Sequence, residues 1–401
     1  MKIVFVSNFL NHHQLLFCQE LLKLTNGEFA FVALTPVPGD RLSLGYYDMN
    51  KQYPFVICAY ESDAKMKQGH SLAEEADILI IGGIHDTIAH TFIAPRISAD
   101  KISYWYCERR YKRGLLRALS PKNLSIIKNC HNVHKCDHVY MLCASAYTAW
   151  DYGLTHSYVN KTFKWGYFPK VEQYDLDKLI LQKRQDNKTK IVWCARFIPL
   201  KHPETMLALA KRLKMDGESF IIEMVGSGEM LEDFKKAVNN EGLSDVIHLL
   251  GAVSPEEVRS HMKKANIFIF TSDYNEGWGA VLNEAMNSAC AVISGHAIGS
   301  TAFLVSHKEN GFVYKSGSDR SIYSAVKHLI ANPDLCDELG KRAYKTIIDE
   351  WSPTMAAERL VTLSSHLLRG EKTPYDRGPC SQAPRIPQRK MYRYLKNRSL
   401  Q

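Results

Sequence analysis

Long apolar runs are absent from this chain of 401 residues, and their absence limits where the protein acts. No run reaches the ~18 apolar residues that would span a bilayer. The first residues, MKIVFVSNF, contain one lysine and a four-residue apolar run, whereas a secretory leader needs an apolar region of about 7–15 residues. We therefore interpret this segment as a first β-strand and expect a cytoplasmic protein.

A disulfide framework is not expected either, although the chain has ten cysteines. Most of them, including Cys58, Cys143, Cys194 and Cys290, lie within apolar runs, and no secretion signal accompanies them. Reduced thiols are the expected state. The apolar fraction of 45% excludes wholesale disorder, and the length is sufficient for two domains with cores of their own.

Acidic residues are scarce at the C-terminal end. Between positions 369 and 401 there are nine Lys and Arg but only two Asp and Glu, so this tail carries most of the net charge of +9. No domain-wide basic stripe accompanies it, which argues against a nucleic-acid partner. With Tyr392, Tyr394 and Leu395 interleaved, the tail is typical of a segment that binds an anionic membrane surface. We therefore expect peripheral attachment to the inner face of the plasma membrane.

Short apolar runs alternate with helical patterns through most of the chain. This alternation predicts α/β domains whose parallel sheets are covered on both faces. The expected strands are 2–7, 28–34, 54–60, 77–82, 102–106, 138–143, 162–168, 189–195, 220–225, 246–250 and 266–271. The expected helices include 12–24, 121–135, 145–153, 203–215, 229–240, 254–264 and 350–368.

Composition divides the chain into segments. The stretch 171–188 is rich in charged and amide residues, so we interpret it as a linker between a domain of residues 1–170 and one of residues 189–350. A helix at 351–369 follows. The last segment, 370–401, contains four prolines and is expected to be a basic, partly disordered tail. Two open α/β domains in tandem place a ligand cleft between the carboxyl ends of their strands.

The most informative segment is 272–295, SDYNEGWGAVLNEAMNSACAVISG. It follows the apolar run 267–270 and passes through a Gly-Trp-Gly turn into a short helix and another apolar run. Backbone N–H groups and the helix dipole at such a turn favour an anionic group. Glu276 and Glu284 flank that place, and carboxylates accept hydrogen bonds from sugar hydroxyls. The combination predicts a nucleotide-sugar site.

Cations are expected at the same edge of the second sheet. Arg196 and Lys201 follow the strand at 189–195, where Arg can grip two phosphate oxygens and Lys acts as a point charge. The next strand ends in Gly226-Ser-Gly228, which by itself is as compatible with a plain turn as with nucleotide binding.

Together these segments resemble the retaining family-4 glycosyltransferases of the GT-B fold. The order ARFIPLKHP, MVGSGEM, HLLGAVSPEEV, NEGWGAVLNEAM and NGFVY is similar to that family's donor domain over residues 189–365, and the two acids with seven residues between them are its best-known signature. The first half, with SNFLNHHQ, ASAYTAWDYG and KWGYFP, is similar to bacterial members that build surface polysaccharides. The resemblance implies two Rossmann-like doubly wound domains, an acceptor-binding one followed by a donor-binding one, and a C-terminal helix that crosses back.

The resemblance also implies roles for individual residues. The donor diphosphate would be held by two cations, the sugar and ribose by two carboxylates, and the phosphate and base by glycine-rich turns. In that order the residues are Arg196 and Lys201; Glu276 and Glu284; Gly277, Trp278 and Gly279; and Gly226 and Gly228.

Two places depart from the family pattern. Three residues, at 273–275, separate Ser272 from Glu276, whereas the family has two. The family often has a His after the fifth strand, facing the donor sugar, but this chain reads Tyr-Cys-Glu-Arg there, and Glu108 is the candidate to replace it.

Other polar clusters have less specific interpretations. His12 and His13 follow the first strand and are expected to line the cleft, in acceptor binding or in loop packing. The run from His131 through His134 and Cys136 to His138 looks metal-like, but no second cluster accompanies it, which favours a helix end followed by a strand over a zinc site.

Charged runs outside the donor segments are also ambiguous. Asp175 and Asp177 form an Asp-x-Asp pair, a pattern that holds a divalent metal in other transferases, but the pair falls in the expected linker. The basic run at 109–117, RRYKRGLLR, is expected to be a solvated face, with an anionic acceptor or a lipid headgroup as the second interpretation.

The sequence therefore predicts a metal-independent glycosyltransferase that moves a sugar from a nucleoside-diphosphate donor to a hydroxyl of a glycan or lipid-linked acceptor. The alternatives are a nucleotide-sugar epimerase, and a non-catalytic subunit that binds nucleotide-sugars. A phosphorylase is disfavoured because no motif for a pyridoxal lysine is recognisable.

Overall fold

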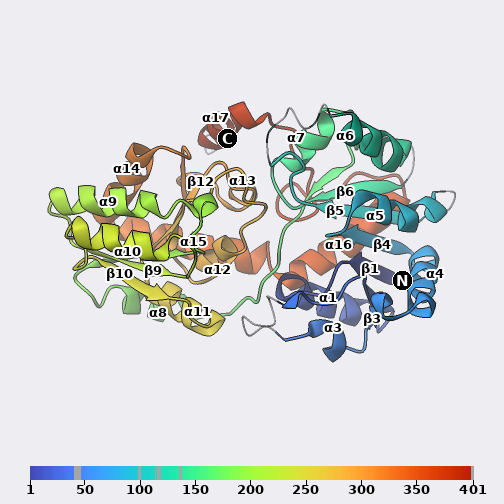
Figure 1. The fold of residues 1–401 in the computed structure, drawn as a ribbon, viewed down its shortest axis with the longest axis horizontal. Helices are drawn as coiled ribbons and strands as arrows, with labels where there is room; N and C mark the ends of the chain where they lie inside the picture. The colour runs from blue at the N-terminus through green and yellow to red at the C-terminus, as the bar shows by residue number, and fades with distance from the viewer. Residues whose placement is uncertain are drawn as a thin grey trace. The chain divides into compact units, whose positions relative to one another are not determined.

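A computed structural model describes residues 1–39, 47–97, 101–112, 114, 118, 120–134 and 138–398 (Figure 1). The chain forms two compact units. Unit 1 comprises Met1–Lys170 and Trp351–Arg385, and unit 2 comprises Val171–Glu350 and Ile386–Gln401. Within the described ranges, every helix is too short or too polar to cross a membrane.

Unit 1 is built on a parallel sheet of seven strands in the order β3-β2-β1-β4-β5-β6-β7. Most of its strand residues are buried, as expected for a sheet that is covered on both faces. The strands are β1 (Ile3–Ser7), β2 (Phe29–Ala33), β3 (Val56–Cys58), β4 (Ile78–Gly82), β5 (Ile102–Cys107), β6 (Val139–Cys143) and β7 (Thr162–Lys164). The α-helices are α1 (His12–Leu24), α3 (Met49–Gln52), α4 (Asp63–Glu75), α5 (Asp86–Ile93), α6 (Pro121–Ile126), α7 (Thr148–Gly153) and α16 (Pro353–Leu368).

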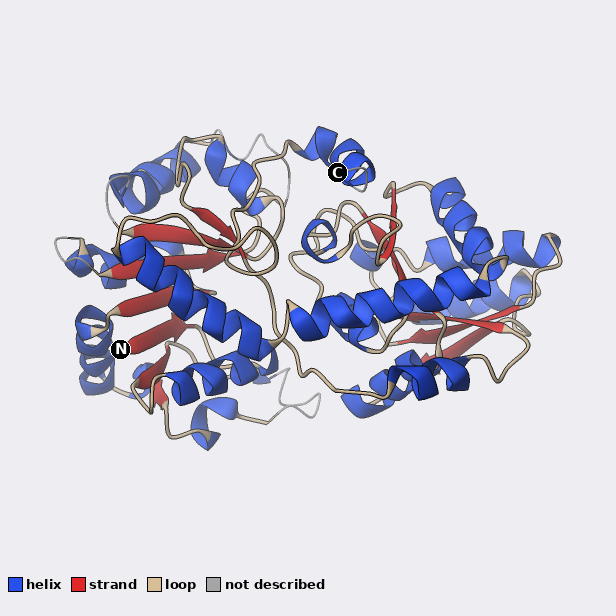
Figure 2. Ribbon diagram, turned by 180° about the vertical axis from the view of Figure 1, so that it is seen from behind, coloured by secondary structure: helices blue, strands red, loops and turns tan. Residues whose placement is uncertain are grey.

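Unit 2 is built on a second parallel sheet, of six strands in the order β10-β9-β8-β11-β12-β13. The strands are β8 (Thr189–Cys194), β9 (Phe220–Val225), β10 (Ile247–Gly251), β11 (Ile267–Phe270), β12 (Ala291–Gly295) and β13 (Gly311–Tyr314). The α-helices are α8 (Leu176–Lys183), α9 (Glu204–Met215), α10 (Leu231–Asn240), α11 (Pro255–Lys264), α12 (Val281–Asn287), α13 (Thr301–Leu304), α14 (Asp319–Ile330), α15 (Pro333–Asp349) and α17 (Gln388–Arg398). Figure 2 shows helices on both faces of each sheet.

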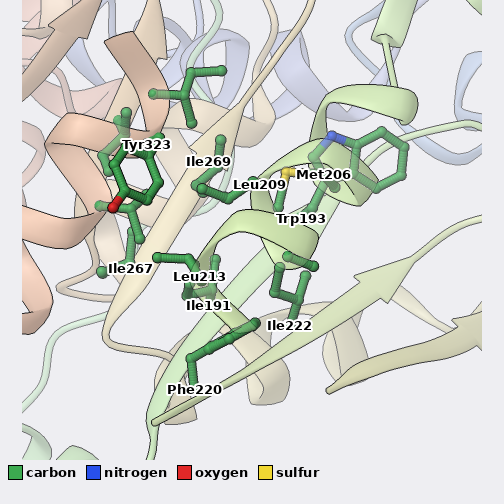
Figure 3. Packing of buried hydrophobic residues seen from close by; sticks show 14 of the residues in the cluster. Ile191, Trp193, Met206, Leu209, Leu213, Phe220, Ile222, Ile267, Ile269 and Tyr323 are labelled. Atoms are coloured by element: carbon green, nitrogen blue, oxygen red, sulfur yellow. The ribbon is translucent and has the colours of Figure 1, made fainter. Parts of the chain in front are cut away.

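The core of unit 2 forms where the strands meet their covering helices. Apolar side chains of β8, β9 and β11 pack with those of α9, as Figure 3 shows for Trp193, Ile222 and Leu209. These side chains are almost fully buried, so the apolar runs that mark the strands in the sequence supply one continuous core. The expected α/β class with two parallel-sheet domains is confirmed.

The helix at the end of the second half returns to the first unit. Helix α16 packs beside α1, and Ser364 on α16 lies 2.9 Å, oxygen to oxygen, from the hydroxyl of Tyr104 on β5. Both side chains are fully buried. The expected C-terminal helix that crosses back is therefore confirmed.

The segment interpreted as a linker contains a packed helix. In α8, Leu179 and Ile180 are buried in unit 2. The Asp-x-Asp pair that precedes and opens this helix has ordinary partners, because Asp175 caps α8 by accepting the N–H of Lys178 at 3.2 Å and Asp177 pairs with Lys341 at 2.8 Å. The linker interpretation is wrong for residues 176–183. Leu179 and Ile180 pack into unit 2 although many of their neighbours in the sequence are charged.

The start of the tail is irregular but ordered. The N–H groups of Cys380 and Ala383 donate to carbonyls of Lys164 and Thr162, both at 2.8–2.9 Å, so this segment pairs with the outer edge of β7. Cys380 is fully buried. An exposed strand edge is open to pairing with another chain, and here residues of the tail cover it.

The end of the tail is helical, contrary to the expectation of partial disorder. Helix α17 belongs to unit 2 and buries Met391 and Leu395 completely, while Arg389, Lys390 and Arg393 are exposed. Two apolar residues four positions apart form one stripe on a helix, and their burial explains why this basic segment folds.

Candidate active site

The strand order of unit 2 reverses between β8 and β11. Because the strands are parallel, their carboxyl ends lie at one edge of the sheet, and ligands of open α/β sheets bind at such a reversal. Two hydrogen bonds connect the loops that follow these two strands. The N–H of Asp273 donates to the carbonyl of Leu200 at 3.2 Å, and the hydroxyl of Thr271 donates to the carbonyl of Lys201.

Lys201 and Glu276 meet at this edge. The Lys201 ammonium forms an ion pair with the Glu276 carboxylate, and each side chain is only 13% exposed. The ammonium also lies 5.6 Å from the centre of the Phe270 ring. The structure thus brings together one predicted cation and one predicted acid that are 75 positions apart in the sequence.

Arg196 is at the same strand end but behaves differently. Its side chain is exposed and makes no hydrogen bond or ion pair with the residues that the structure describes. Its carbonyl accepts the N–H of Ile198 at 2.9 Å, which shapes the loop that leads to Lys201. The expected convergence is therefore present for Lys201, whereas the Arg196 guanidinium projects into solvent.

Glu284 on α12 and Cys194 at the end of β8 both have raised pKa values. Burial raises the pKa of Glu284, and Arg259 opposes the shift. Burial also raises the pKa of Cys194 to about 12, with the Glu284 carboxylate acting in the same direction and the Lys201 ammonium opposing it.

The turn after β9 needs its glycines for a close approach. Gly226 and Gly228 have φ of +139° and +153°. A Cβ atom on Gly226 would lie 1.9 Å from the carbonyl oxygen of Ala195, and one on Gly228 would lie 2.4 Å from that of Phe197. The N–H of Phe197 donates to the carbonyl of Ser227 at 2.8 Å. The turn is thus packed directly on the loop that carries the cations.

The Gly-Trp-Gly turn is closely packed. The Trp278 ring is fully buried and its Nε1 donates to Asn283 Oδ1 at 2.9 Å, so only the backbone of Trp278 remains for the predicted ligand contact. Gly279 has a φ of +84°, and a Cβ there would lie 2.5 Å from the Phe270 ring. Gly277 is buried beside them.

A histidine–tyrosine contact at this edge has no counterpart in the sequence interpretation. The Tyr274 hydroxyl lies 2.8 Å from Nε2 of His296, which follows β12, and Nδ1 of His296 accepts the N–H of Ser316 at 3.0 Å. Burial lowers the pKa of His296 to about 4, and Lys315 acts in the same direction. The imidazole is therefore neutral near pH 7.

Three residues predicted on the first domain also come together. The Tyr167 hydroxyl donates to Glu108 at 2.6 Å, and the His13 ring stacks on the Tyr167 ring with 5.3 Å between centres. Lys112 pairs with the other oxygen of Glu108 at 2.5 Å. The rings of His12 and His13 lie 3.7 Å apart. Glu108, His12 and His13 thus form one cluster near the carboxyl ends of β1 and β5.

His131, the first residue of the metal-like run, makes ordinary contacts within the protein. His131 is buried, and its ring lies 2.9 Å from the Tyr158 hydroxyl and 3.6 Å from an Asp86 oxygen. Among the described residues no group of three His, Cys, Asp or Glu is arranged to hold a metal ion. Cys136 and the side chain of His134 lie outside the described part of the chain.

The basic run at 109–117 is not simply a solvated face. Arg109 is 5% exposed, with its Nε 3.7 Å from the buried Asp151, and Arg110 pairs with Asp86 at 2.6 Å. Although burial opposes ionisation, His131 and Arg110 hold the pKa of Asp86 at about 2. The expectation of a solvated face is wrong for these two arginines, because carboxylates from α5 and α7 neutralise them. Positions 113 and 117 lie outside the described residues.

Comparison with known proteins gives a consistent picture. Residues 179–346 match the family model described as glycosyl transferases group 1. The chain is 26% identical over 196 residues to a GDP-mannose-dependent alpha-(1-6)-phosphatidylinositol monomannoside mannosyltransferase of Mycobacterium tuberculosis, which covers 47% of this chain and 49% of that protein. It is 21% identical over 170 residues to a poly(ribitol-phosphate) alpha-N-acetylglucosaminyltransferase of Staphylococcus aureus, which covers 42% and 34%.

Solved structures extend the likeness over nearly the whole chain. HepE of Anabaena, in complex with UDP, aligns with a TM-score of 0.67 and 15% identity over 91% of this chain and 100% of that one. TarM of S. aureus aligns with a TM-score of 0.53 and 17% identity over 74% and 59%. The resemblance to glycosyltransferases of the GT-B fold is confirmed. In sequence, the chain spans about half of the length of the mannosyltransferase that it matches.

The close approach at Gly279 generates a test of this architecture. We expect Gly279→Ala to destabilise unit 2 by about 1–2 kcal/mol from left-handed backbone strain and by a further ~1–3 kcal/mol from the clash with Phe270. Gly317→Ala is the matched control, because Gly317 has a similar φ of +76° and open space around it. Urea denaturation measures both, and equal losses would contradict the packing described here.

Proposed function

We propose that the protein transfers a sugar from a nucleoside-diphosphate donor to a hydroxyl of a glycan or glycolipid acceptor, with retention of configuration. The observation that carries this proposal is the Lys201–Glu276 pair at the reversal of strand order in a glycosyl transferases group 1 domain. A cation and a carboxylate side by side match the two ends of a nucleotide-sugar, because the diphosphate is anionic and the sugar offers hydroxyl donors.

The difficult step is departure of the diphosphate, which gathers negative charge as the glycosidic bond breaks. Preorganised cations near that oxygen lower the barrier by about 3 kcal/mol each in a closed site. Lys201, held in place by Glu276 and Phe270, supplies one such charge, and the exposed Arg196 reaches the diphosphate from the same loop. These two charges carry the step without a metal ion.

Retention of configuration is compatible with attack on the face that the leaving group vacates. In that geometry the departing phosphate oxygen accepts the proton of the acceptor hydroxyl, so no separate general base is needed. Glu276 accepts hydrogen bonds from the donor sugar and Glu284 from the ribose. The backbone of residues 277–279 faces the phosphate, and the turn at 226–228 borders the base.

The acceptor side belongs to unit 1 in this proposal. Glu108 is fixed by Tyr167 and Lys112, and the stacked rings of His13 and Tyr167 offer a flat surface of the kind that sugar rings pack against. His12 lies beside them. A carboxylate with an aromatic surface is suited to a hydroxyl-rich acceptor rather than to an apolar one.

Alanine substitutions test the donor machinery. We expect Arg196→Ala, Lys201→Ala and Glu276→Ala each to lower the rate of sugar transfer about 100-fold or more, because each removes charge or hydrogen bonding aimed at the reacting groups. The exposed Lys235 on α10 provides the control Lys235→Ala, for which no loss is expected. Circular dichroism checks that each variant folds. Near-normal turnover in all three variants would refute the assignment.

The nucleotide is open to direct test. HepE was solved with UDP, and the mycobacterial relative is named for GDP-mannose, so both nucleotide classes belong in a thermal-shift series of UDP- and GDP-sugars. A true donor at 100 times its dissociation constant is expected to stabilise the folded chain by about 2.7 kcal/mol. Product analysis without acceptor separates an epimerase, which changes the donor. Stabilisation with neither hydrolysis nor transfer indicates a non-catalytic subunit, and no stabilisation by any donor contradicts nucleotide-sugar binding.

A peripheral membrane location is supported by one face of α17. Arg389, Lys390 and Arg393 are exposed, whereas the apolar stripe of the helix is packed against unit 2. Attachment to an anionic inner membrane face would therefore be electrostatic, at about 1 kcal/mol per basic residue.

Co-sedimentation with vesicles tests this attachment. We expect replacement of Arg389, Lys390 and Arg393 together by Gln to lower partitioning onto phosphatidylserine-containing vesicles about 100-fold. Replacement of the exposed Lys235, Lys264 and Lys345 by Gln removes the same charge elsewhere in unit 2 and is the control. Equal partitioning of the first variant and the wild type would exclude α17 as the membrane contact.

A further inference from the structure

Helix α17 is attached to unit 2 at two histidines as well as by its apolar stripe. The Tyr392 ring meets the His296 ring edge to face, with centres 5.4 Å apart and planes at 66°. One turn further, Lys396 Nζ lies 2.6 Å from Nε2 of His307. Helix α17 also packs beside β13, and Met391 and Leu395 are completely buried. The helix is thus a fixed part of the unit that holds the donor residues.

His296 connects this helix to the candidate active site. Its Nδ1 accepts the N–H of Ser316, so in the neutral ring the proton is on Nε2. That proton is donated to the Tyr274 hydroxyl, 2.8 Å away. Ser316 also accepts the N–H of Ala297 at 3.1 Å, which holds the segment on the other side of His296. The direction of the hydrogen bond from ring to hydroxyl is therefore set by the backbone.

Tyr274 belongs to the turn that carries Glu276. The N–H of Glu276 donates to the carbonyl of Asp273 at 3.1 Å, and the N–H of Asn275 donates to Asp273 Oδ1 at 2.7 Å. Asp273 ties the first end of this turn to the loop of Lys201 through Leu200. On its other side, the turn is held by the Tyr274 side chain, which contacts His296 after β12.

We propose that α17, through Tyr392 and His296, positions the turn that carries Glu276. Tyr392 orients the imidazole, the imidazole holds the Tyr274 hydroxyl, and the turn then presents Glu276 to its partner Lys201. His296, Tyr274 and Tyr392 are positioning residues in this scheme, and their effect on transfer rests on the proposed function. Small displacements of groups near the reaction are costly, so a rigid second layer of support is the expected arrangement.

The test compares variants that keep ring shape with variants that remove it. His296→Phe keeps a ring but removes both nitrogen contacts, and Tyr274→Phe removes only the hydroxyl. Tyr392→Ala removes the ring that faces His296, whereas Tyr392→Phe keeps it. Tyr394→Ala is the matched control, because residue 394 is two positions along α17 and so lies on the opposite side of the helix.

The first measurement is amide hydrogen exchange of residues 271–279, which needs no nucleotide. We expect exchange there to become about fivefold faster in His296→Phe and in Tyr274→Phe, the factor for loss of one hydrogen bond. The double variant should equal His296→Phe, because the Tyr274 hydroxyl has already lost its partner there. Tyr392→Ala should also accelerate exchange, and Tyr392→Phe should restore the wild-type rate. Exchange in β9, within the same unit, should not change.

Unchanged exchange at 271–279 in both His296→Phe and Tyr274→Phe would overturn the positioning role. Equal behaviour of Tyr392→Ala and Tyr394→Ala would remove α17 from it. If His296→Phe does not fold, Tyr274→Phe still decides, because it changes one hydroxyl on a partly exposed side chain. The second measurement is transfer rate, expected to fall in the same order of variants. Failure of the wild type to bind UDP and GDP would instead refute the proposed function, and it would leave the exchange result valid.

Discussion

The hydroxyl of Thr271 fixes the geometry on which the candidate site depends. It accepts the indole N–H of Trp193 at 2.8 Å and donates to the backbone carbonyl of Lys201. Trp193 is part of the apolar core between β8 and α9, so the hydroxyl connects that core to the loop that holds the cation. A buried hydroxyl with both a donor and an acceptor partner is fully satisfied, which favours one arrangement of the two loops. The position of Lys201, and through it of Glu276, follows from the packing of the sheet.

Most of the fold could be predicted from the sequence because parallel strands buried on both faces appear as continuous apolar runs. The strand at 220–225 has the predicted bounds for this reason. The helix at 12–24 also has the predicted bounds. Helix α8 was not predicted because it is short and lies in a segment with many charged and amide residues, and α17 was not predicted because basic residues outnumber its apolar ones. Their stability comes from burial of Leu179 and Ile180 in one case and of Met391 and Leu395 in the other, which only the tertiary structure reveals.

The candidate site, like the fold, could be predicted only in part. Lys201 and Glu276 follow strands whose carboxyl ends must share an edge, so their pairing could be foreseen from strand order. The contact of Tyr274 with His296 could not, because no spacing rule relates two loops that are 22 positions apart. The environment of Arg110 was predicted wrongly for the same kind of reason. Its partner Asp86 lies on a different helix, and a run of basic letters does not show which carboxylates come from elsewhere.

The tail pairs with β7 through residues that are translated late. Thr162 donates its hydroxyl to the carbonyl of Ala383, 221 positions further along the chain. On the ribosome, the outer edge of β7 therefore stays unpaired until the whole second sheet has been synthesised. Such long sequence separations slow folding and leave a strand edge open to other nascent chains. Completion of the first unit is thus a late event in biosynthesis, and it depends on nearly all of unit 2 having been made before it.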